Sequence, residues 1–435
     1  MTKYVSTLVL CLLVVGLTQT TLASEAPGVL AAKAVSENPS ESATAIAELR
    51  TLGPTGLRTL IDLHSQQISE YVANPNLAAT PEWLRLSAAL DAVSQQRNSY
   101  MSGLYWYTNL AEAKRAAAAA GKPILSLRLL GRLTDELSCA NSRFFRTVLY
   151  SNAEISAALR ERFILHWETV RPAPIITIEF GDGRKLVRTI TGNSIHYILD
   201  SDGQVIDGLP GLYGPAAFMR AIGETEGIFK RMRDVEPELK WGLLVSYYRN
   251  RVNRLSLDWL NDVKKTGGQE PEGVLIRQDH NGNALAIMPI AITKAMTETT
   301  MLRSMMSVSE ALGRTTDDEA WKKIAALHQD DARLDEHSIT LIKRQTQDLP
   351  DGSKSLNNLL RTLQDSIALD TVRNEYKLHV KLYSWLFTDR RRTELNALNE
   401  KVYAELFASP RSDPWLGLLA PDVYTGLDNG GVVKK

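Results

Sequence analysis

Cysteine is scarce in this sequence, and neither sign of charge is in excess. Two cysteines among 435 residues are too few for a disulfide-stapled fold or a cysteine-rich metal site. Fifty Lys and Arg balance fifty Asp and Glu, so no net field draws the chain to nucleic acid or to an anionic membrane. No phosphate-binding loop, dinucleotide glycine fingerprint or G-x-S-x-G motif is present, and we expect no cofactor. The composition, 44% apolar and 23% charged, is that of a globular protein with two or three domains.

Long apolar runs are equally scarce. One run, residues 8–17, follows Lys3 and precedes a group of small residues, an order typical of a secretory signal peptide that we place at residues 1–24. The run is shorter than the roughly 20 apolar residues that a membrane span needs, so we expect no membrane association once the signal is removed. The sequence therefore predicts an exported protein, periplasmic or secreted, in which Cys139 is the single remaining thiol.

The two ends of the mature chain have helical patterns. Over residues 25–100 apolar residues recur at helical spacing, Gly53-Pro54 divides two helices, and Thr80 is expected to cap another. Beyond residue 225 the same three- and four-residue spacing returns. We therefore predict mostly α-helical regions over residues 25–100 and 226–435.

The middle of the chain, residues 101–225, mixes helix and strand signals. A helix-forming run ends at Gly121 and precedes an apolar strand candidate at 123–127, and a second strand candidate lies at 163–167. Asn152 is placed to cap the helix between them. Two further strand pairs flank short glycine-containing turns, which predicts two β-hairpins. The turns are Gly181-Asp182-Gly183 and Ser201-Asp202-Gly203.

Several short motifs in this middle segment resemble the thioredoxin-like superfamily. They are Trp106, Ala113-Lys114, Gly121-Lys122-Pro123-Ile124-Leu125, Cys139-Ala140-Asn141-Ser142 and Tyr197-Ile198-Leu199-Asp200-Ser201-Asp202-Gly203. The resemblance implies an α/β thioredoxin-like domain over residues 101–225, with a central mixed sheet, flanking helices and an extra β-hairpin. That domain would be embedded between the helical regions.

The resemblance also singles out a candidate site. The family's redox motif is C-x-x-C, but here Ser142 replaces the second cysteine, so a mixed disulfide at Cys139 could not be released by intramolecular attack. The resemblance implies that Ser142 is the hydrogen-bond partner of the sulfur and that Asn193 and Ser194 form the substrate-facing loop. Because side chains alternate along a strand, His196 shares a face with Ser194 and is a candidate imidazole near the thiol.

Two interpretations of this site remain open. In the first, Cys139 stands exposed at a helix N-terminus, which with Arg143 favours the thiolate, and it exchanges disulfides or captures a protein client as a mixed disulfide. In the second, Cys139 is buried and inert, and the domain is a redox-inactive scaffold for protein–protein interaction. The partners are proteins in both cases.

Metal ligation is not expected. His328, Asp331 and Asp335 have the spacing of one helical face, and Glu375 with His379 forms a second pair. Such pairs are common on solvated helices, so we predict no metal site.

Overall fold

The computed structural model describes most of the chain but not the predicted signal peptide, residues 1–24, which lies outside the described residues. The described residues are 25–189, 192–268, 308–347, 356–388 and 394–415, the backbones of two strands at 274–278 and 284–289, and a few residues beyond 415. Among the described helices, none has the length and apolar content to cross a membrane.

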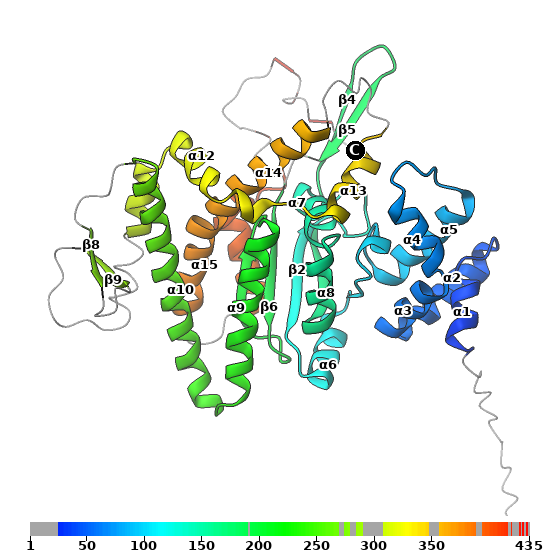
Figure 1. Cartoon of the computed structure of the whole chain (residues 1–435), viewed down its shortest axis with the longest axis horizontal. Coiled ribbons are helices and arrows are strands. Elements are labelled where there is room, and N and C mark those ends of the chain that lie inside the picture. The colour runs from blue at the N-terminus through cyan, green and yellow to red at the C-terminus, as the bar shows by residue number, and fades with distance from the viewer. Residues whose placement is uncertain are drawn as a thin grey trace, which may run out of the picture.

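A mixed five-stranded sheet lies at the centre of the protein (Figure 1). Its order is β1-β3-β2-β6-β7, in which β1, β3 and β2 run parallel, while β6 is antiparallel to β2 and β7 to β6. The strands are β1 (Trp106–Tyr107), β2 (Ile124–Leu130), β3 (Ile164–Arg171), β6 (Ser194–Leu199) and β7 (Val205–Pro210). Every residue of β2 and β6 is buried, as expected for central strands covered on both faces. The predicted mixed α/β architecture is confirmed.

Helices connect and cover these strands. They are α6 (Leu110–Ala120), α7 (Ala140–Phe144), the π-helical segment η2 (Phe145–Leu149), α8 (Ala153–Arg162) and α9 (Pro215–Arg233). The predicted ends of two of them are confirmed. Gly121 ends α6 with a φ of 62°, and the Asn152 side chain accepts a hydrogen bond of 3.0 Å from the Ile155 N–H at the start of α8.

The N-terminal region is helical, as the apolar spacing predicts. It contains α1 (Pro27–Lys33), α2 (Pro39–Thr51), α3 (Pro54–Leu63), α4 (Ser65–Ala73), α5 (Pro81–Ser94) and the 3-10 turn η1 (Ser99–Met101). Thr80 caps α5 by accepting a hydrogen bond of 3.2 Å from the Trp83 N–H, as predicted. These helices enclose a hydrophobic cluster of their own, centred on Leu49, Leu60 and Leu90.

The C-terminal region is mostly helical. Its elements are α10 (Pro237–Lys265), a helix at residues 308–315, α12 (Asp318–Leu327), η3 (Gln329–Ala332), α13 (Glu336–Gln345), α14 (Leu356–Arg373), the π-helical η4 (Asn374–His379), α15 (Val380–Thr388), α16 (Leu395–Lys401) and the π-helical η5 (Val402–Leu406). It also contains an antiparallel pair of strands, β8 (Val274–Gln278) and β9 (Ala284–Pro289), which the helical pattern of residues 226–435 does not predict.

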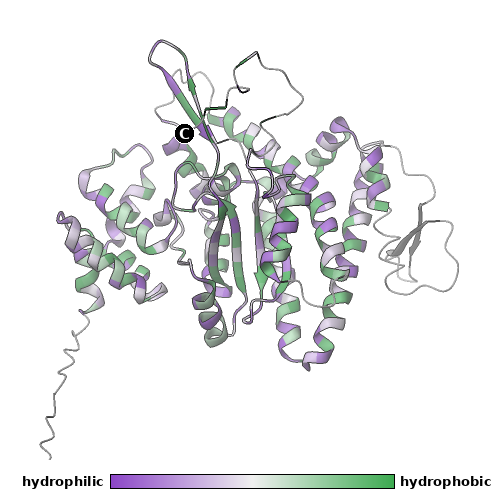
Figure 2. Cartoon of the chain, turned by 180° about the vertical axis from the view of Figure 1, so that it is seen from behind, coloured by the Kyte–Doolittle hydropathy of each residue, from purple (hydrophilic) through white to green (hydrophobic). Residues whose placement is uncertain are grey.

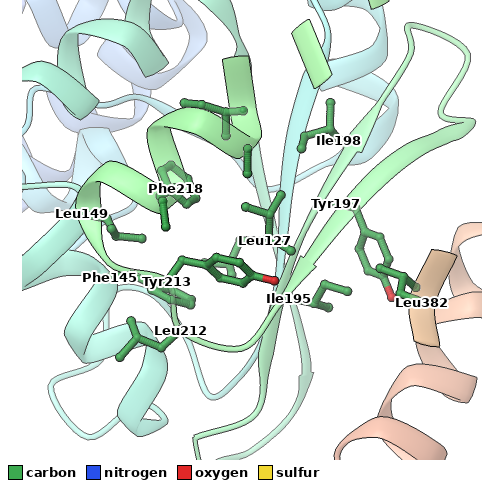
Figure 3. Packing of buried hydrophobic residues seen from close by; sticks show 14 of the residues in the cluster. Leu127, Phe145, Leu149, Ile195, Tyr197, Ile198, Leu212, Tyr213, Phe218 and Leu382 are labelled. Carbon is green, nitrogen blue, oxygen red and sulfur yellow. The ribbon is translucent and has the colours of Figure 1, made fainter. Parts of the chain in front are cut away.

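One continuous core joins the sheet to helices on both sides of it. Tyr197 of β6 points toward Leu382 of α15, whereas Phe218 of α9 and Phe145 of η2 lie on the other side of the sheet (Figure 3). The core therefore includes side chains from the middle and from the C-terminal region of the sequence.

A predicted hairpin is confirmed between β3 and β6. Strands β4 (Ile175–Glu179) and β5 (Lys185–Thr189) form a separate two-stranded sheet that extends away from the rest of the protein (Figures 1 and 2). Its turn has positive φ angles at Gly181 and Gly183, which glycine adopts without strain. All five residues of β4 are exposed.

Candidate functional site

Cys139 lies at one end of the central sheet. Its N–H donates a hydrogen bond of 3.1 Å to the carbonyl oxygen of Leu130, the last residue of β2, and α7 begins at the next residue. The chain turns back here through Gly131, whose φ is 75° and where a Cβ atom would lie only 3.2 Å from the Ser138 Cα. Only glycine fits this turn easily, and the turn sets the place of the thiol.

The sulfur of Cys139 contacts the loop that the resemblance indicates. Its Sγ lies 3.1 Å from the Oγ of Ser194 and 3.9 Å from the carbonyl oxygen of Asn193. The open position of the first interpretation, however, is wrong, because Cys139 is 0% exposed and belongs to the main hydrophobic core. The structure thus brings the thiol, Asn193 and Ser194 together but keeps water away from the sulfur.

The cover over this position comes from the far end of the chain. The Tyr403 hydroxyl donates a hydrogen bond of 3.1 Å to the Asn193 carbonyl oxygen, and the Asn193 amide donates one of 3.0 Å to Ser409 Oγ. Arg171 of β3 donates to the Ser409 carbonyl oxygen at 2.6 Å. Burial, followed by the nearby Cys139, raises the pKa of Tyr403, so the phenol stays protonated and keeps donating.

The expected hydrogen bond from Ser142 to the sulfur is wrong. The Ser142 hydroxyl instead lies 2.9 Å from the Cys139 carbonyl oxygen and 2.7 Å from Ser138 Oγ. A serine in the first turn of a helix reaches the carbonyl three residues earlier more readily than the side chain of that residue. The Ser142 side chain therefore forms a hydrogen bond with the backbone of this turn and not with the sulfur.

His196 forms a hydrogen bond with Tyr150 and not with the thiol of Cys139. It is buried on β6, its Nε2 lies 2.6 Å from the Tyr150 hydroxyl, and its ring packs 4.5 Å from that of Phe145. Burial lowers the pKa of His196 to about 3, so the imidazole is neutral at physiological pH. The predicted role as a substrate-facing imidazole is wrong, because Tyr150 satisfies the ring in the core.

A buried arginine holds the loop that precedes Cys139. Arg146 donates hydrogen bonds to the carbonyl oxygens of Leu133 and Asp135, at 3.0 and 2.7 Å, and to Ser138 Oγ at 3.3 Å. Burial lowers its pKa to about 10, which still leaves it charged at neutral pH. Its donors are used by the loop and not by the sulfur.

A second polar centre, which the sequence patterns did not indicate, surrounds Asp207 of β7. This carboxylate is 1% exposed, and its oxygens accept hydrogen bonds from side chains on four helical elements. The donors are Thr225 of α9 (3.0 Å), Tyr247 of α10 (2.5 Å), His379 of η4 (3.1 Å) and Tyr383 of α15 (3.0 Å). A buried charge is tolerated only with such compensation.

The protonation states in this network follow from its geometry. Burial raises the pKa of Asp207, but hydrogen bonds from His379 and Tyr247 outweigh burial, so this pKa lies below its usual value. Burial lowers the pKa of His379 despite the neighbouring Asp207. An ionised Asp207 therefore accepts a hydrogen bond from a neutral His379, whose other ring nitrogen, Nδ1, has no hydrogen-bond partner among the described residues.

A charged cavity of about 380 Å³ lies next to this network, between α9, α10 and η4. Glu375 lines it, and its carboxyl group makes no hydrogen bond or ion pair with the residues that the structure describes. Burial raises the pKa of Glu375 to about 7. His328 also lines the cavity, and its hydrogen bond of 2.6 Å to Asp262 is the main reason that its pKa rises to about 9.

Among the residues weighed as metal ligands, Glu375 and His379 both lie in η4, but the other three do not share one helix. His328 lies between α12 and η3, Asp331 is in η3, and Asp335 caps α13. Asp331 forms an ion pair with Arg220 of α9, and its Oδ2 lies 3.5 Å from His328 Nδ1. Over the part of the chain that the structure describes, no group of three His, Cys, Asp or Glu side chains could hold a metal ion.

Comparison with protein-family models, with curated proteins and with solved structures finds no match to this chain. The candidate site is therefore described by its geometry alone. Sequence reasoning missed Asp207, although one signal was available: a single carboxylate inside the otherwise uncharged run Val205-Ile206-Asp207-Gly208-Leu209. A carboxylate in such a run must either lie outside the sheet or have hydrogen-bond partners in the protein interior.

Proposed function

We propose that the protein is a redox-inactive interaction scaffold, built on a thioredoxin-like sheet, which binds a partner protein through hairpin β4–β5. The exported location expected from residues 1–24 is part of this proposal. The thioredoxin-like assignment is supported by a mixed sheet whose last two strands form an antiparallel hairpin, with Cys139 at the start of the helical segment after β2.

One observation carries the proposal. Cys139 is 0% exposed, whereas five large apolar side chains of the neighbouring hairpin are 39 to 56% exposed. They are Ile175, Ile176, Ile178, Phe180 and Val187. The hairpin is tied to the thiol end of the sheet because Thr189 Oγ1 donates a hydrogen bond of 3.2 Å to the Ser138 carbonyl oxygen.

The exposed apolar side chains of the hairpin are unfavourable in water unless another surface covers them. Two strands alone are marginally stable in water, and exposed apolar side chains on a strand favour pairing with another chain. Strand β4 is uncharged up to Glu179, whereas β5 carries Lys185 and Arg188, which oppose edge-to-edge pairing. The partner we propose is therefore a protein segment that adds an extended apolar strand to the free edge of β4.

The test compares three variants of the tagged protein, expressed in the cells that make it, by the proteins that copurify. Ile176→Glu with Ile178→Glu removes the apolar face while placing a carboxylate opposite Arg188, which keeps the hairpin paired. Leu84→Glu with Leu239→Glu is the matched control, because both leucines are exposed and lie in the first turn of a helix, where an acid is tolerated. The third variant is Cys139→Ala.

The proposal predicts one partner that the wild type, the control and Cys139→Ala retain and the hairpin variant loses. Loss of that partner with Cys139→Ala, together with its retention by the hairpin variant, contradicts the scaffold and supports thiol capture.

Mixed-disulfide capture of a client is the second candidate, and one observation favours it. The sulfur of Cys139 already contacts Ser194 and Asn193, and a single segment, with Tyr403 and Ser409, covers them. This function requires that segment to move. Tyr403→Ala should then raise the rate of alkylation of Cys139 in the native protein by about tenfold or more; an unchanged rate would remove this candidate.

A further inference from the structure

A cavity of about 590 Å³ lies between the N-terminal helices and the edge of the central sheet, away from the thiol. Its walls come from α3, from the segment that leads into β1, and from α8 and the start of β3. This volume is in the range of sites that hold small organic molecules.

Cations dominate the charged side chains of this cavity. Arg58 of α3, Lys122 before β2 and Arg160 of α8 line it, against one carboxylate, Asp62. None of the four forms an ion pair with another residue that the structure describes, whereas the buried Arg128 and Arg251 each have a carboxylate partner. The cavity thus has three cationic side chains against one carboxylate.

The two arginines also interact electrostatically. Arg160 donates a hydrogen bond to the Ser102 carbonyl oxygen, which fixes its guanidinium at the wall. Burial lowers the pKa of Arg160, Glu161 raises it, and the nearby Arg58 lowers it again. Two guanidinium groups that repel each other beside a cavity are stabilised by an anion between them.

The start of helix α3 adds to this positive field. Gly53 occupies the cap position without a side chain to accept from the first N–H groups, and Pro54 and Thr55 of the first turn line the cavity. The positive end of the ten-residue helix therefore faces the same space as Arg58.

Aromatic side chains form part of the wall. Tyr105 and Tyr107 line the cavity with their rings 5.1 Å apart and edge to face, and Phe163 also lines it, next to β3. The Tyr105 hydroxyl donates to the Arg50 carbonyl oxygen at 3.0 Å, whereas the Tyr107 hydroxyl has no hydrogen-bond partner among the described residues. An anion that fits here would carry a flat or apolar body against these rings.

We propose that this cavity binds a small organic anion, with its carboxylate or phosphate group between Arg58, Lys122 and Arg160 and its aromatic or apolar body against Tyr105 and Tyr107. The proposal is independent of the scaffold function, because the cavity and hairpin β4–β5 share no residue.

Calorimetric titration of the full chain with four probes tests it. 1-Naphthyl phosphate and 1-naphthoate offer the two anionic groups on one aromatic body, 1-naphthalenemethanol lacks the charge, and inorganic phosphate lacks the body. We expect at least one of the two naphthyl anions to bind tenfold or more tightly than both the neutral probe and inorganic phosphate. Which of the two binds more tightly identifies the group as phosphate or carboxylate.

Three variants locate the binding. Arg58→Gln, at an exposed position, should weaken it about tenfold, and Thr55→Trp should abolish it by filling the cavity while keeping every charge. Arg314→Gln, an exposed arginine on the helix at residues 308–315, is the control and should bind like the wild type. Binding that survives both cavity variants, or inorganic phosphate that binds as tightly as the naphthyl anions, overturns the proposal. Unchanged thermal unfolding midpoints confirm that each variant is folded.

Discussion

Two buried polar centres lie on this sheet, and they are compensated in different ways. The Cys139 thiol is surrounded by uncharged partners, a serine hydroxyl and a backbone carbonyl. The Asp207 carboxylate needs donors from four helical elements. A buried thiol behaves as a small apolar group and can be accommodated in any close-packed interior. A buried ionised carboxylate is tolerated only where several elements of the fold supply hydrogen-bond donors to it.

The largest expected effect tests that contrast at Asp207. Asp207→Asn keeps the shape but removes the charge that four side chains donate to, so we expect the free energy of unfolding to fall by about 3 kcal/mol. Urea unfolding followed by circular dichroism measures it. A loss below about 1 kcal/mol would mean that the network stabilises no more than an ordinary hydrogen bond.

His328, near the same network, should contribute a pH-dependent stability. Because its folded pKa is raised to about 9, the contribution is fully present below the unfolded value near 6.5 and is lost as pH rises through 9. His328→Gln should therefore cost about 2 kcal/mol at pH 6 and much less at pH 10. Urea titrations at both pH values check this, and an equal loss at both would contradict it.

Glu375 offers the opposite case, a half-buried carboxyl without a hydrogen-bond or ion-pair partner among the described residues. Its folded pKa of about 7 exceeds the unfolded value, so ionisation destabilises the folded state increasingly as pH rises from about 4.5 to 7. Glu375→Gln should then stabilise the protein by about 1.5 kcal/mol at pH 8 and hardly at all at pH 4.5. Thermal unfolding at the two pH values measures this. Glu319→Gln, an exposed control on α12, should show no such difference.

The smallest effect is expected at the thiol. Cys139→Ala removes one buried sulfur and its hydrogen bond to Ser194, for which we expect a loss of about 1 kcal/mol or less. Urea unfolding of Cys139→Ala measures this loss, which is then compared with the loss for Asp207→Asn. If the two losses are equal, the distinction between the two centres fails.

Local features could be predicted from the sequence because their causes are local. Thr80 and Asn152 cap helices within three residues of themselves, and Gly121 ends α6 through its own backbone conformation. The hairpins were likewise set by their turns. The strand that carries Ser194 also lies beside Cys139, as the resemblance implied.

The remaining features depend on residues far away in the chain. Tyr403, which covers the thiol, is 210 residues from Asn193, and nothing in the pattern around either residue indicates the pairing. Ser142 shows a different failure, because its spacing from Cys139 was right but its hydroxyl prefers the carbonyl oxygen of that residue to the sulfur. The spacing of two residues in the sequence predicts that they are neighbours. Which hydrogen bond forms between them depends on the competing acceptor atoms nearby.

The partners of Asp207 also bear on how the chain is made. His379 and Tyr383 lie 172 and 176 residues after it, so a ribosome that has just completed β7 has produced a carboxylate whose final donors do not yet exist. The last strand of the sheet can reach its native surroundings only after η4 and α15 have been synthesised. Until then, the interior around Asp207 lacks two of the side chains that donate to its carboxylate in the folded protein.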